Sequence, residues 1–152
     1  MLPTPKKYFL TAAAAEGESG LTAFDNALLA GGIGNINLLR VSSILPPGAQ
    51  HDPELKIPPG SLVPTAYGYI VSKEPGQLIS AAVGIGFSAD TFGVIMEFSG
   101  LCGKEEAEKR ILAMLEEAFR TRQMELVRTE VRAVEHVVKK IGCALAAVPL
   151  WY

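Results

Sequence analysis

Two adjacent serines end an apolar segment and stand just ahead of two prolines. Ser42 and Ser43 follow the run of residues 35–41, and Pro46 and Pro47 come next. Polar residues between a strand and a turn are ordinary, but this pair also allows a specific reaction. If their peptide bond is strained, the Ser43 hydroxyl attacks the carbonyl carbon of Ser42, and the amide becomes an ester. Elimination from that ester would leave one chain that ends at Ser42 and another that begins with a pyruvoyl group made from Ser43.

Two carboxylates in apolar surroundings are the next candidates for chemistry. Glu97 lies near the end of the apolar stretch Gly93–Phe98. It either faces solvent or is desolvated, and desolvation would raise its pKa and suit it to act as a general acid. Asp25 either is an exposed residue of a first helical turn or pairs with a cation, ideally a guanidinium. The sequence pattern alone leaves both alternatives open for both residues.

The histidines give a weaker signal. His51 or His136, together with Ser43 and an acid, would make a hydrolytic triad. The chain has no G-x-S-x-G motif, and nothing in the sequence brings these residues together. His136 lies next to Glu135 in an alternating segment, where a solvent-facing or hydrogen-bonded histidine is ordinary. With two histidines and scattered acidic residues, no metal site is expected.

The glycines and cysteines predict no further site. Gly32–Gly34 and Gly84–Gly86 lack the strand, loop and helix context of a phosphate-binding loop, so turns and close packing explain them. Cys102 and Cys143 fit no metal-binding spacing, and we interpret them as free thiols in a reducing cytoplasm.

Length and composition indicate one cytoplasmic domain. The chain has 152 residues, of which 49% are hydrophobic and 20% charged, with a net charge of −2. This is enough apolar material for a core, and the charge balance gives no sign of nucleic-acid binding. The N-terminal segment has weak signal-peptide features, but we interpret it as an edge strand followed by a loop. No apolar run approaches the roughly 18 residues of a membrane span.

Periodicity and turn residues predict seven strands and two helices. One helix is expected over Ala23–Ala30, capped by Thr22, with Phe24, Leu28 and Leu29 buried. The other is expected from Gly103 to Arg122, with an inward stripe of Ala107, Ile111, Leu115, Ala118 and Phe119.

The strands are expected over Lys7–Ala13, Asn35–Val41, Leu62–Ser72, Leu78–Phe87, Thr91–Ser99, Leu126–Val138 and Cys143–Trp151. Residues 42–59, with five prolines, are expected to form a long loop. Runs of strands between helices favour an α+β fold with antiparallel or mixed sheets.

The segments around the candidate residues resemble one family over nearly the whole chain. The matching segments are LTAFDNALL, GIGNINLLRVSSILPPGA, LVPTAYGYI, GVIMEFSG and VEHVVKKIGCALAAVPLWY. They closely resemble the pyruvoyl-dependent arginine decarboxylases of archaea and some bacteria. The resemblance implies that residues 1–152 form one domain, a four-layer αββα sandwich. It also implies a precursor that cuts itself between Ser42 and Ser43 into a β chain of residues 1–42 and an α chain of residues 43–152.

The same resemblance implies the reaction and the residues that perform it. Arginine would be converted to agmatine and CO2 by a covalent pyruvoyl cofactor made from Ser43, with neither pyridoxal phosphate nor a metal ion. Glu97 matches the family's catalytic glutamate and would act as the general acid, and Asp25 would hold the substrate guanidinium. Asn37 would position either the Ser42 carbonyl during cleavage or the substrate carboxylate later. The new Ser42 carboxylate would also lie near the substrate.

The resemblance further implies a homotrimer of αβ units with sites at subunit interfaces, and no nucleic-acid or membrane partner. One alternative keeps the pyruvoyl chemistry but changes the substrate to another amino acid, such as aspartate or histidine. Asp25 argues against an acidic substrate, because its carboxylate would repel one. The other alternative is an unprocessed, inactive family member with a binding or assembly role. Asp25, Asn37, Ser43 and Glu97 all match the family pattern, which argues against that alternative.

Overall fold

The computed structural model of the chain describes residues 2–152, which form ten strands and two helices. The helices are α1 (Gly20–Ala30) and α2 (Lys104–Thr121). The strands are β1 (Lys7–Tyr8), β2 (Thr11–Glu16), β3 (Asn37–Arg40), β4 (Ile44–Leu45), β5 (Gln50–His51), β6 (Leu62–Ser72), β7 (Leu78–Phe87), β8 (Gly93–Gly100), β9 (Arg128–Val137) and β10 (Gly142–Trp151).

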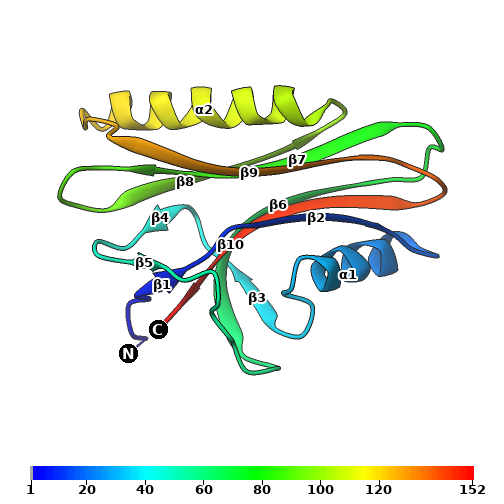
Figure 1. Cartoon of the computed structure of the whole chain (residues 1–152), viewed down its shortest axis with the longest axis horizontal. Helices are drawn as coiled ribbons and strands as arrows, with labels where there is room; N and C mark the ends of the chain where they lie inside the picture. Colours follow the sequence, from blue (N-terminus) through cyan, green and yellow to red (C-terminus); the bar gives the residue numbers. More distant parts are fainter. Residues whose placement is uncertain (1) are drawn as a thin grey trace.

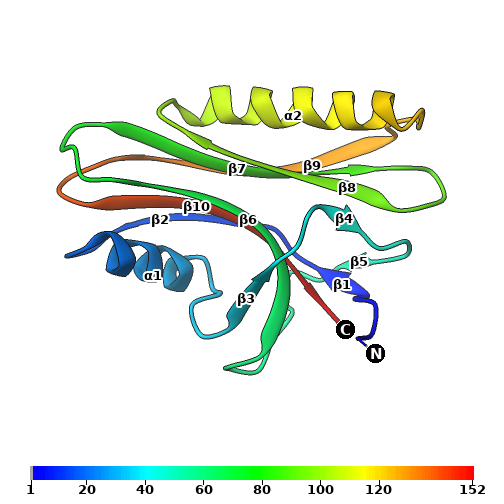
Figure 2. The ribbon, with the colours of Figure 1, turned by 180° about the vertical axis from the view of Figure 1, so that it is seen from behind.

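The strands form two sheets that stack face to face between the two helices (Figure 1). One sheet has six strands, in the order β3-β6-β10-β1-β5, with β2 also paired to β10. The other has four strands, in the order β4-β8-β7-β9. Helix α1 covers the outer face of the six-stranded sheet and α2 that of the four-stranded sheet, as the view from behind also shows (Figure 2). The predicted α+β sandwich of four layers with mixed sheets is confirmed.

Apolar side chains fill each of the three boundaries between these layers. Tyr8, Leu45, Ile85, Ile95 and Val148 are among those between the two sheets. Separate clusters lie under α1 and under α2. Strands β7 and β10 are buried along almost their whole length, because each lies between the other sheet and a helix. Their continuous apolar sequences reflect this burial on both faces.

Helix α2 follows its predicted pattern. The predicted inward stripe is buried in full, namely Ala107, Ile111, Leu115, Ala118 and Phe119. The first turn carries Glu105 and Glu106, where negative charge is favoured by the helix dipole. The period of the apolar residues was therefore sufficient to place this helix.

Helix α1 begins earlier than predicted. The cap is Ser19 rather than Thr22, and the two side chains form a reciprocal capping box. The Ser19 hydroxyl accepts from the Thr22 backbone N–H at 3.1 Å, and the Thr22 hydroxyl accepts from the Ser19 N–H at 2.9 Å.

The buried face of α1 also differs from the prediction. Its buried residues are Ala23, Ala27 and Leu28, whereas Phe24 is only partly buried and Leu29 is 50% exposed. Because the alanines are small, the helix lies close to β2 and β10. A search for large apolar residues at helical spacing does not detect such a face.

Two regions of strand were predicted incorrectly. The single strand expected over Lys7–Ala13 is two strands, β1 and β2, both of which pair with β10. The region 42–59, expected to be a loop, contains β4 and β5. Each of these is two residues long and pairs with a distant strand, so no local period marks it. The strands expected over Leu62–Ser72 and Leu78–Phe87 are confirmed with the same bounds.

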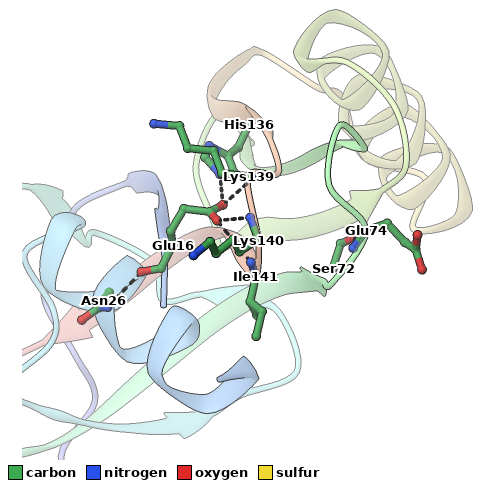
Figure 3. A network of polar contacts seen from close by, with 8 residues as sticks. All are labelled: Glu16, Asn26, Ser72, Glu74, His136, Lys139, Lys140 and Ile141. Atoms are coloured by element: carbon green, nitrogen blue, oxygen red, sulfur yellow. Dashed lines mark hydrogen bonds and ion pairs between the residues drawn. The ribbon is translucent and has the colours of Figure 1, made fainter. Parts of the chain in front are cut away.

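A carboxylate at the end of β2 ties the two sheets together (Figure 3). Glu16 Oε2 lies 2.6 Å from Nε2 of His136 on β9. The same carboxylate accepts from the backbone N–H groups of Lys139, Lys140 and Ile141 at 3.3, 2.8 and 3.2 Å. Burial acts to raise the pKa of Glu16, but the bonds from His136 and the turn outweigh it and lower that pKa to about 2. His136 is thus the hydrogen-bonded histidine that the sequence favoured.

Two further features bear on the sequence analysis. Cys102 and Cys143 are both free, as predicted, and burial raises the pKa of the Cys143 thiol to about 12. Within residues 2–152, neither helix combines the length and the apolar character that crossing a membrane requires.

Candidate active site

The chain passes from one sheet to the other at the Ser-Ser pair, in a segment that we call the sheet crossing (residues 41–43). Before it, β3 runs parallel to β6, and the Val41 N–H donates to the Thr65 carbonyl at 3.2 Å. After it, the Ser43 carbonyl accepts from the Ile95 N–H at 2.7 Å, and β4 continues antiparallel to β8. Ser42 is exposed and Ser43 half-buried. The peptide bond between them is therefore held on one side by β6 and on the other by β8.

The same strand that anchors Ser43 carries Glu97. Ile95 belongs to the core between the sheets, and Glu97 lies on the same face of β8 because alternate residues of a strand share a face. Opposite it stands Gly68 of β6, where an added Cβ would lie 3.3 Å from both Cβ and Cγ of Glu97. The glycine thus leaves the space between the sheets that the Glu97 side chain occupies.

The Glu97 side chain is partly buried between the sheets. Burial raises its pKa, and the nearby positive charge of Arg40 acts in the opposite direction. Across residues 2–152, no hydrogen bond or ion pair holds its carboxylate, in contrast to that of Glu16. A carboxyl group in this setting keeps its proton to a higher pH than an exposed glutamate does. Of the two alternatives that the sequence left open for Glu97, the structure shows the desolvated one.

A cavity of about 640 Å³, which we call the Glu97 cavity, opens where β3 has left the edge of β6. It is lined by Arg40, Tyr67, Gly68, Tyr69, Ile70, Val71, Glu97, Phe98 and Ser99. Arg40 Nη2 donates to the Tyr67 carbonyl at 2.6 Å, and the guanidinium carbon lies 4.3 Å from the centroid of the Tyr67 ring. The cavity thus holds one carboxyl group and one fixed positive charge.

A second cavity, of about 330 Å³, contains two other predicted residues and is called the Asp25 cavity. It is lined by Phe24, Asp25, Leu28, Gly34, Ile36, Asn37, Leu38 and Tyr67. Asp25 is an exposed residue of α1, and Asn37 opens β3. The Asn37 amide donates to the Gly60 carbonyl at 3.0 Å, which fixes its orientation. Tyr67 lines both cavities, and it packs under α1, whereas the next residue of β6, Gly68, faces Glu97.

The predicted site residues therefore fall into three neighbouring groups. Asp25 and Asn37 share one cavity, and Glu97 lies in the next. Ser42 and Ser43 are not among the lining residues of either cavity, but the Ile95 bond links Ser43 to the strand of Glu97.

Comparisons with known proteins identify relatives of the chain. A family model described as "Pyruvoyl-dependent arginine decarboxylase (PvlArgDC)" matches residues 7–152. The chain belongs to this family.

Similar curated proteins carry the name pyruvoyl-dependent arginine decarboxylase. The protein of Methanocaldococcus jannaschii is 53% identical over 150 residues, which cover 97% of this chain and 91% of that protein. The protein of Pyrococcus furiosus is 49% identical, with 97% and 96% covered, and that of Thermococcus kodakarensis is 46% identical, with 98% and 96% covered. The resemblance found in the sequence and the predicted enzyme class are confirmed.

The histidines take no part in the arrangement around Ser43. His136 is bonded to Glu16. His51 stacks on Tyr8 with ring centroids 5.3 Å apart, and its Nδ1 lies 3.9 Å from a carboxylate oxygen of Glu130. The hydrolytic triad considered from the sequence is therefore not assembled. Within residues 2–152, no group of three His, Cys, Asp or Glu side chains has the arrangement of a metal site.

Arg40, Tyr67 and Gly68 are residues of this family member's cavities that the sequence analysis missed. A signal existed for Arg40, because it is the only charged residue in the apolar segment from Asn35 to Ala49. Tyr67 and Gly68 carry no such local signal. Their importance depends on the end of β3 and on the approach of β8, which only the assembled sheets define.

Proposed function

We propose that the chain cleaves itself between Ser42 and Ser43 and that the product decarboxylates L-arginine to agmatine and CO2. Cleavage would give a β chain of residues 1–42 and an α chain of residues 43–152, which begins with a pyruvoyl group made from Ser43. The sheet crossing is the observation that supports this most directly. Because Val41 is hydrogen-bonded to β6 and Ser43 to β8, the peptide bond between Ser42 and Ser43 is held from both sides.

Ser43 has the hydroxyl that the cleavage needs, because it follows the scissile carbonyl. Its Oγ attacks the carbonyl carbon of Ser42, the C–N bond breaks, and an ester and a free amine form. A proton then leaves the Ser43 Cα, and the Cβ–Oγ bond breaks to release the Ser42 carboxylate. The remaining dehydroalanine takes up one water molecule and releases ammonia, which leaves the pyruvoyl group. No other residue has to supply an atom to the new group.

The residues around Ser43 fit this group. The carbonyl of Ser43 persists in the pyruvoyl group, so the bond from the Ile95 N–H can continue to hold it. When formed, the group accepts the electron pair that is released as CO2 leaves the substrate. Glu97 then returns a proton to the substrate Cα, a role that its raised pKa supports. The proposal includes no pyridoxal phosphate and no metal ion.

Asp25 is proposed to select the substrate. Its carboxylate can hold a guanidinium through two parallel hydrogen bonds, and it would repel an acidic side chain. Asn37 lines the same cavity, which supports a role for both residues toward one ligand. Asn37 would position the Ser42 carbonyl during cleavage or the substrate carboxylate afterwards. The new Ser42 carboxylate is proposed to lie near the substrate as well.

The assembly and the location are proposed from the resemblance. We expect a homotrimer of αβ units in the cytoplasm, with no nucleic-acid or membrane partner. The exposure of Asp25, Asn37 and Ser42 in a single chain supports a site that neighbouring subunits complete. The molar mass in solution, measured by light scattering, would test the trimer.

The intact mass under denaturing and reducing conditions tests the cleavage. Two fragments, residues 1–42 and a pyruvoyl-capped 43–152, are expected from the unmodified sequence. Ser43→Ala should give a single full-length mass. Ser42→Ala is the matched control, because it keeps the attacking hydroxyl and should still cleave. One uncleaved mass for the unmodified chain would favour the inactive family member instead.

A panel of amino acids tests the substrate. Release of CO2 from arginine, with agmatine as the product, is expected from the cleaved protein. Asp25→Asn should raise the KM for arginine while leaving the cleavage intact, because it removes the charge but keeps the shape of the side chain. Release of CO2 from aspartate or histidine but not from arginine would reject the arginine assignment.

A further inference from the structure

The guanidinium of Arg40 is fixed although the residue is exposed. It donates from Nη2 to the Tyr67 carbonyl at 2.6 Å and lies over the ring of the same tyrosine, 4.3 Å from its centroid. An arginine on a surface usually samples many rotamers, but a hydrogen bond and a ring contact to one residue define both the position and the plane of its guanidinium. Arg40 therefore contributes a positively charged group, in a defined position, to the wall of the Glu97 cavity.

Arg40 also caps an edge of β6 that its own strand leaves open. The carbonyls of Thr65, Tyr67 and Tyr69 accept from three donors in turn. These donors are the Val41 N–H at 3.2 Å, Arg40 Nη2, and the Ser99 hydroxyl at 3.1 Å. Val41 is the last backbone donor before the chain turns toward β8, and beyond it side chains take over. Because these carbonyls are satisfied, the edge of β6 can form a cavity wall without an additional strand.

The charge of Arg40 acts inside the cavity that it lines. Beside Glu97, the ionisable residues that line this cavity are Arg40, Tyr67 and Tyr69, and only Arg40 can carry a positive charge. Burial raises the pKa of Glu97, and the attraction of Arg40 for the carboxylate lowers it. The acid strength of Glu97 is thus a balance between its desolvation and one neighbouring cation.

We propose that Arg40 is a positioning residue for the decarboxylation, which holds the edge of β6 at the Tyr67 carbonyl and presents a permanent positive charge to the Glu97 cavity. This role rests on the proposed function, in which Glu97 gives a proton to the substrate Cα. A proton donor must lose its proton readily enough during the reaction and regain it before the next cycle. Burial alone would make Glu97 too weak an acid for this task, and the charge of Arg40 opposes that effect. Arg40 also holds the cavity wall in place through its bond to the Tyr67 carbonyl.

The pH dependence of kcat in three variants tests the role of Arg40. Arg40→Met removes the charge and keeps the length of the side chain. We expect kcat to fall about 10- to 100-fold, within the range that one acid–base group contributes. Activity needs protonated Glu97 and is lost above its pKa, so the alkaline limb of the kcat profile should move to higher pH. Arg40→Lys should restore the position of this limb but not the full kcat, because an ammonium group cannot reproduce the planar contact with Tyr67.

Arg128→Met is the matched control. Arg128 also stacks on an aromatic ring, 3.7 Å from the centroid of Phe87, and it pairs with Glu130, but it is not a lining residue of either cavity. This variant should leave both the profile and kcat unchanged. Intact masses and thermal unfolding curves of all variants show whether each one is cleaved and folded.

The possible results separate this proposal from the one on which it rests. If Arg40→Met loses activity equally at every pH, its role is structural only and the proposal is overturned. If Arg40→Met is folded but uncleaved, Arg40 acts in processing, and the proposal is likewise overturned. If that variant does not fold, Arg40→Gln takes its place as the neutral variant: a limb moved to higher pH supports the proposal, and an equal loss at every pH overturns it. An unmodified chain that neither cleaves nor decarboxylates arginine would instead overturn the proposed function, and the role of Arg40 with it.

Discussion

Two glutamates bridge the same pair of sheets in opposite ways. Glu16 extends from the six-stranded sheet and is held by His136 and by three backbone N–H groups of the β9–β10 turn (Figure 3). Glu97 extends from the four-stranded sheet toward Gly68, and no comparable set of donors surrounds its carboxylate. The pKa of Glu16 is lowered to about 2, whereas burial raises that of Glu97. The charged form of this side-chain type is therefore favoured in one place and its neutral form in the other.

The difference shows how this sandwich separates stability from chemistry. Hydrogen bonds to a carboxylate stabilise its charged form, so Glu16 serves to join the sheets but cannot give up or take a proton near neutral pH. Glu97 lacks these bonds, and burial favours its neutral form, which suits it to the proton transfer that we propose. The two proposed roles can therefore be tested separately. A change at Glu97 should affect turnover and not lower stability, whereas a change at Glu16 should affect stability and not turnover.

The largest expected effect is that of Glu97→Gln on turnover. The amide keeps the shape of the side chain but cannot donate the proton, so kcat should fall by about 10²- to 10⁴-fold. The melting temperature should stay the same or rise, because the substitution removes a desolvated acid. Initial rates of agmatine formation and thermal unfolding measured by circular dichroism check both parts. A large loss of stability with little change in kcat would reverse the roles assigned to Glu97 and Glu16.

The next largest effects are expected from the substitution of two glycines, one beside each carboxylate. A Cβ at Gly142 would lie 2.6 Å from Glu16 Oε2 and 2.9 Å from Cδ2 of His136. Gly142→Ala should therefore break this pair and lower the free energy of unfolding by about 1–3 kcal/mol. A Cβ at Gly68 would meet the Glu97 side chain at 3.3 Å, a distance that small shifts can relieve.

Gly68→Ala is accordingly the matched variant at the other carboxylate. It should stay close to the unmodified protein in stability but lower kcat, because it displaces the proton donor. Urea unfolding and decarboxylation rates of the two variants would check the contrast. If Gly142→Ala and Gly68→Ala lower the free energy of unfolding by the same amount and neither lowers kcat, the contrast between Glu16 and Glu97 is wrong.

A smaller effect is expected from Glu16→Gln. The amide oxygen can still accept some of the bonds from the turn, but the charge that strengthens them is lost. We expect a decrease of about 1 kcal/mol in the free energy of unfolding, with kcat for arginine unchanged. Unfolding is best measured in the Ser43→Ala background, where the chain is expected to stay in one piece. A decrease in kcat without a decrease in stability would connect Glu16 to the active site.

The two glutamates also show which features of the structure could be predicted from the sequence and which could not. Glu97 was a candidate from the sequence because its own strand is apolar, and such a local pattern is visible before the fold is known. Strands β6 and β7 and helix α2 were predicted for the same reason. The partner of Glu16 lies 120 residues away, and no period in the sequence connects the two.

The residues that surround Glu97 illustrate the same limit. Ser43 was predicted from its neighbours along the chain, but β4, which anchors it on β8, is a pair of residues in an apparent loop. Arg40 and Tyr67 lie 27 residues apart and meet only because β3 runs parallel to β6. The chemistry could therefore be predicted from short segments, whereas the geometry that positions it depends on pairings between distant strands.

The smallest expected effect is a difference in slope between the two glutamates as the pH falls. The folded-state pKa of Glu16, about 2, lies below its ordinary value of 4.5, so the folded chain binds fewer protons at this site than the unfolded chain. Its contribution to stability is complete above pH 4.5 and is lost as the pH falls toward 2.

The pH dependence of stability that Glu97 causes has the opposite sign. Because the pKa of Glu97 is raised, the folded state becomes less stable as the pH rises above the ordinary pKa of a glutamate. In the Ser43→Ala background, the stability difference between Glu16 and Glu16→Gln should shrink from pH 5 to pH 2, whereas Glu97→Gln should gain stability relative to its parent as the pH rises. Urea midpoints measured from pH 2 to pH 8 cover both trends, and parallel curves for the two variants would show that the two carboxylates titrate alike.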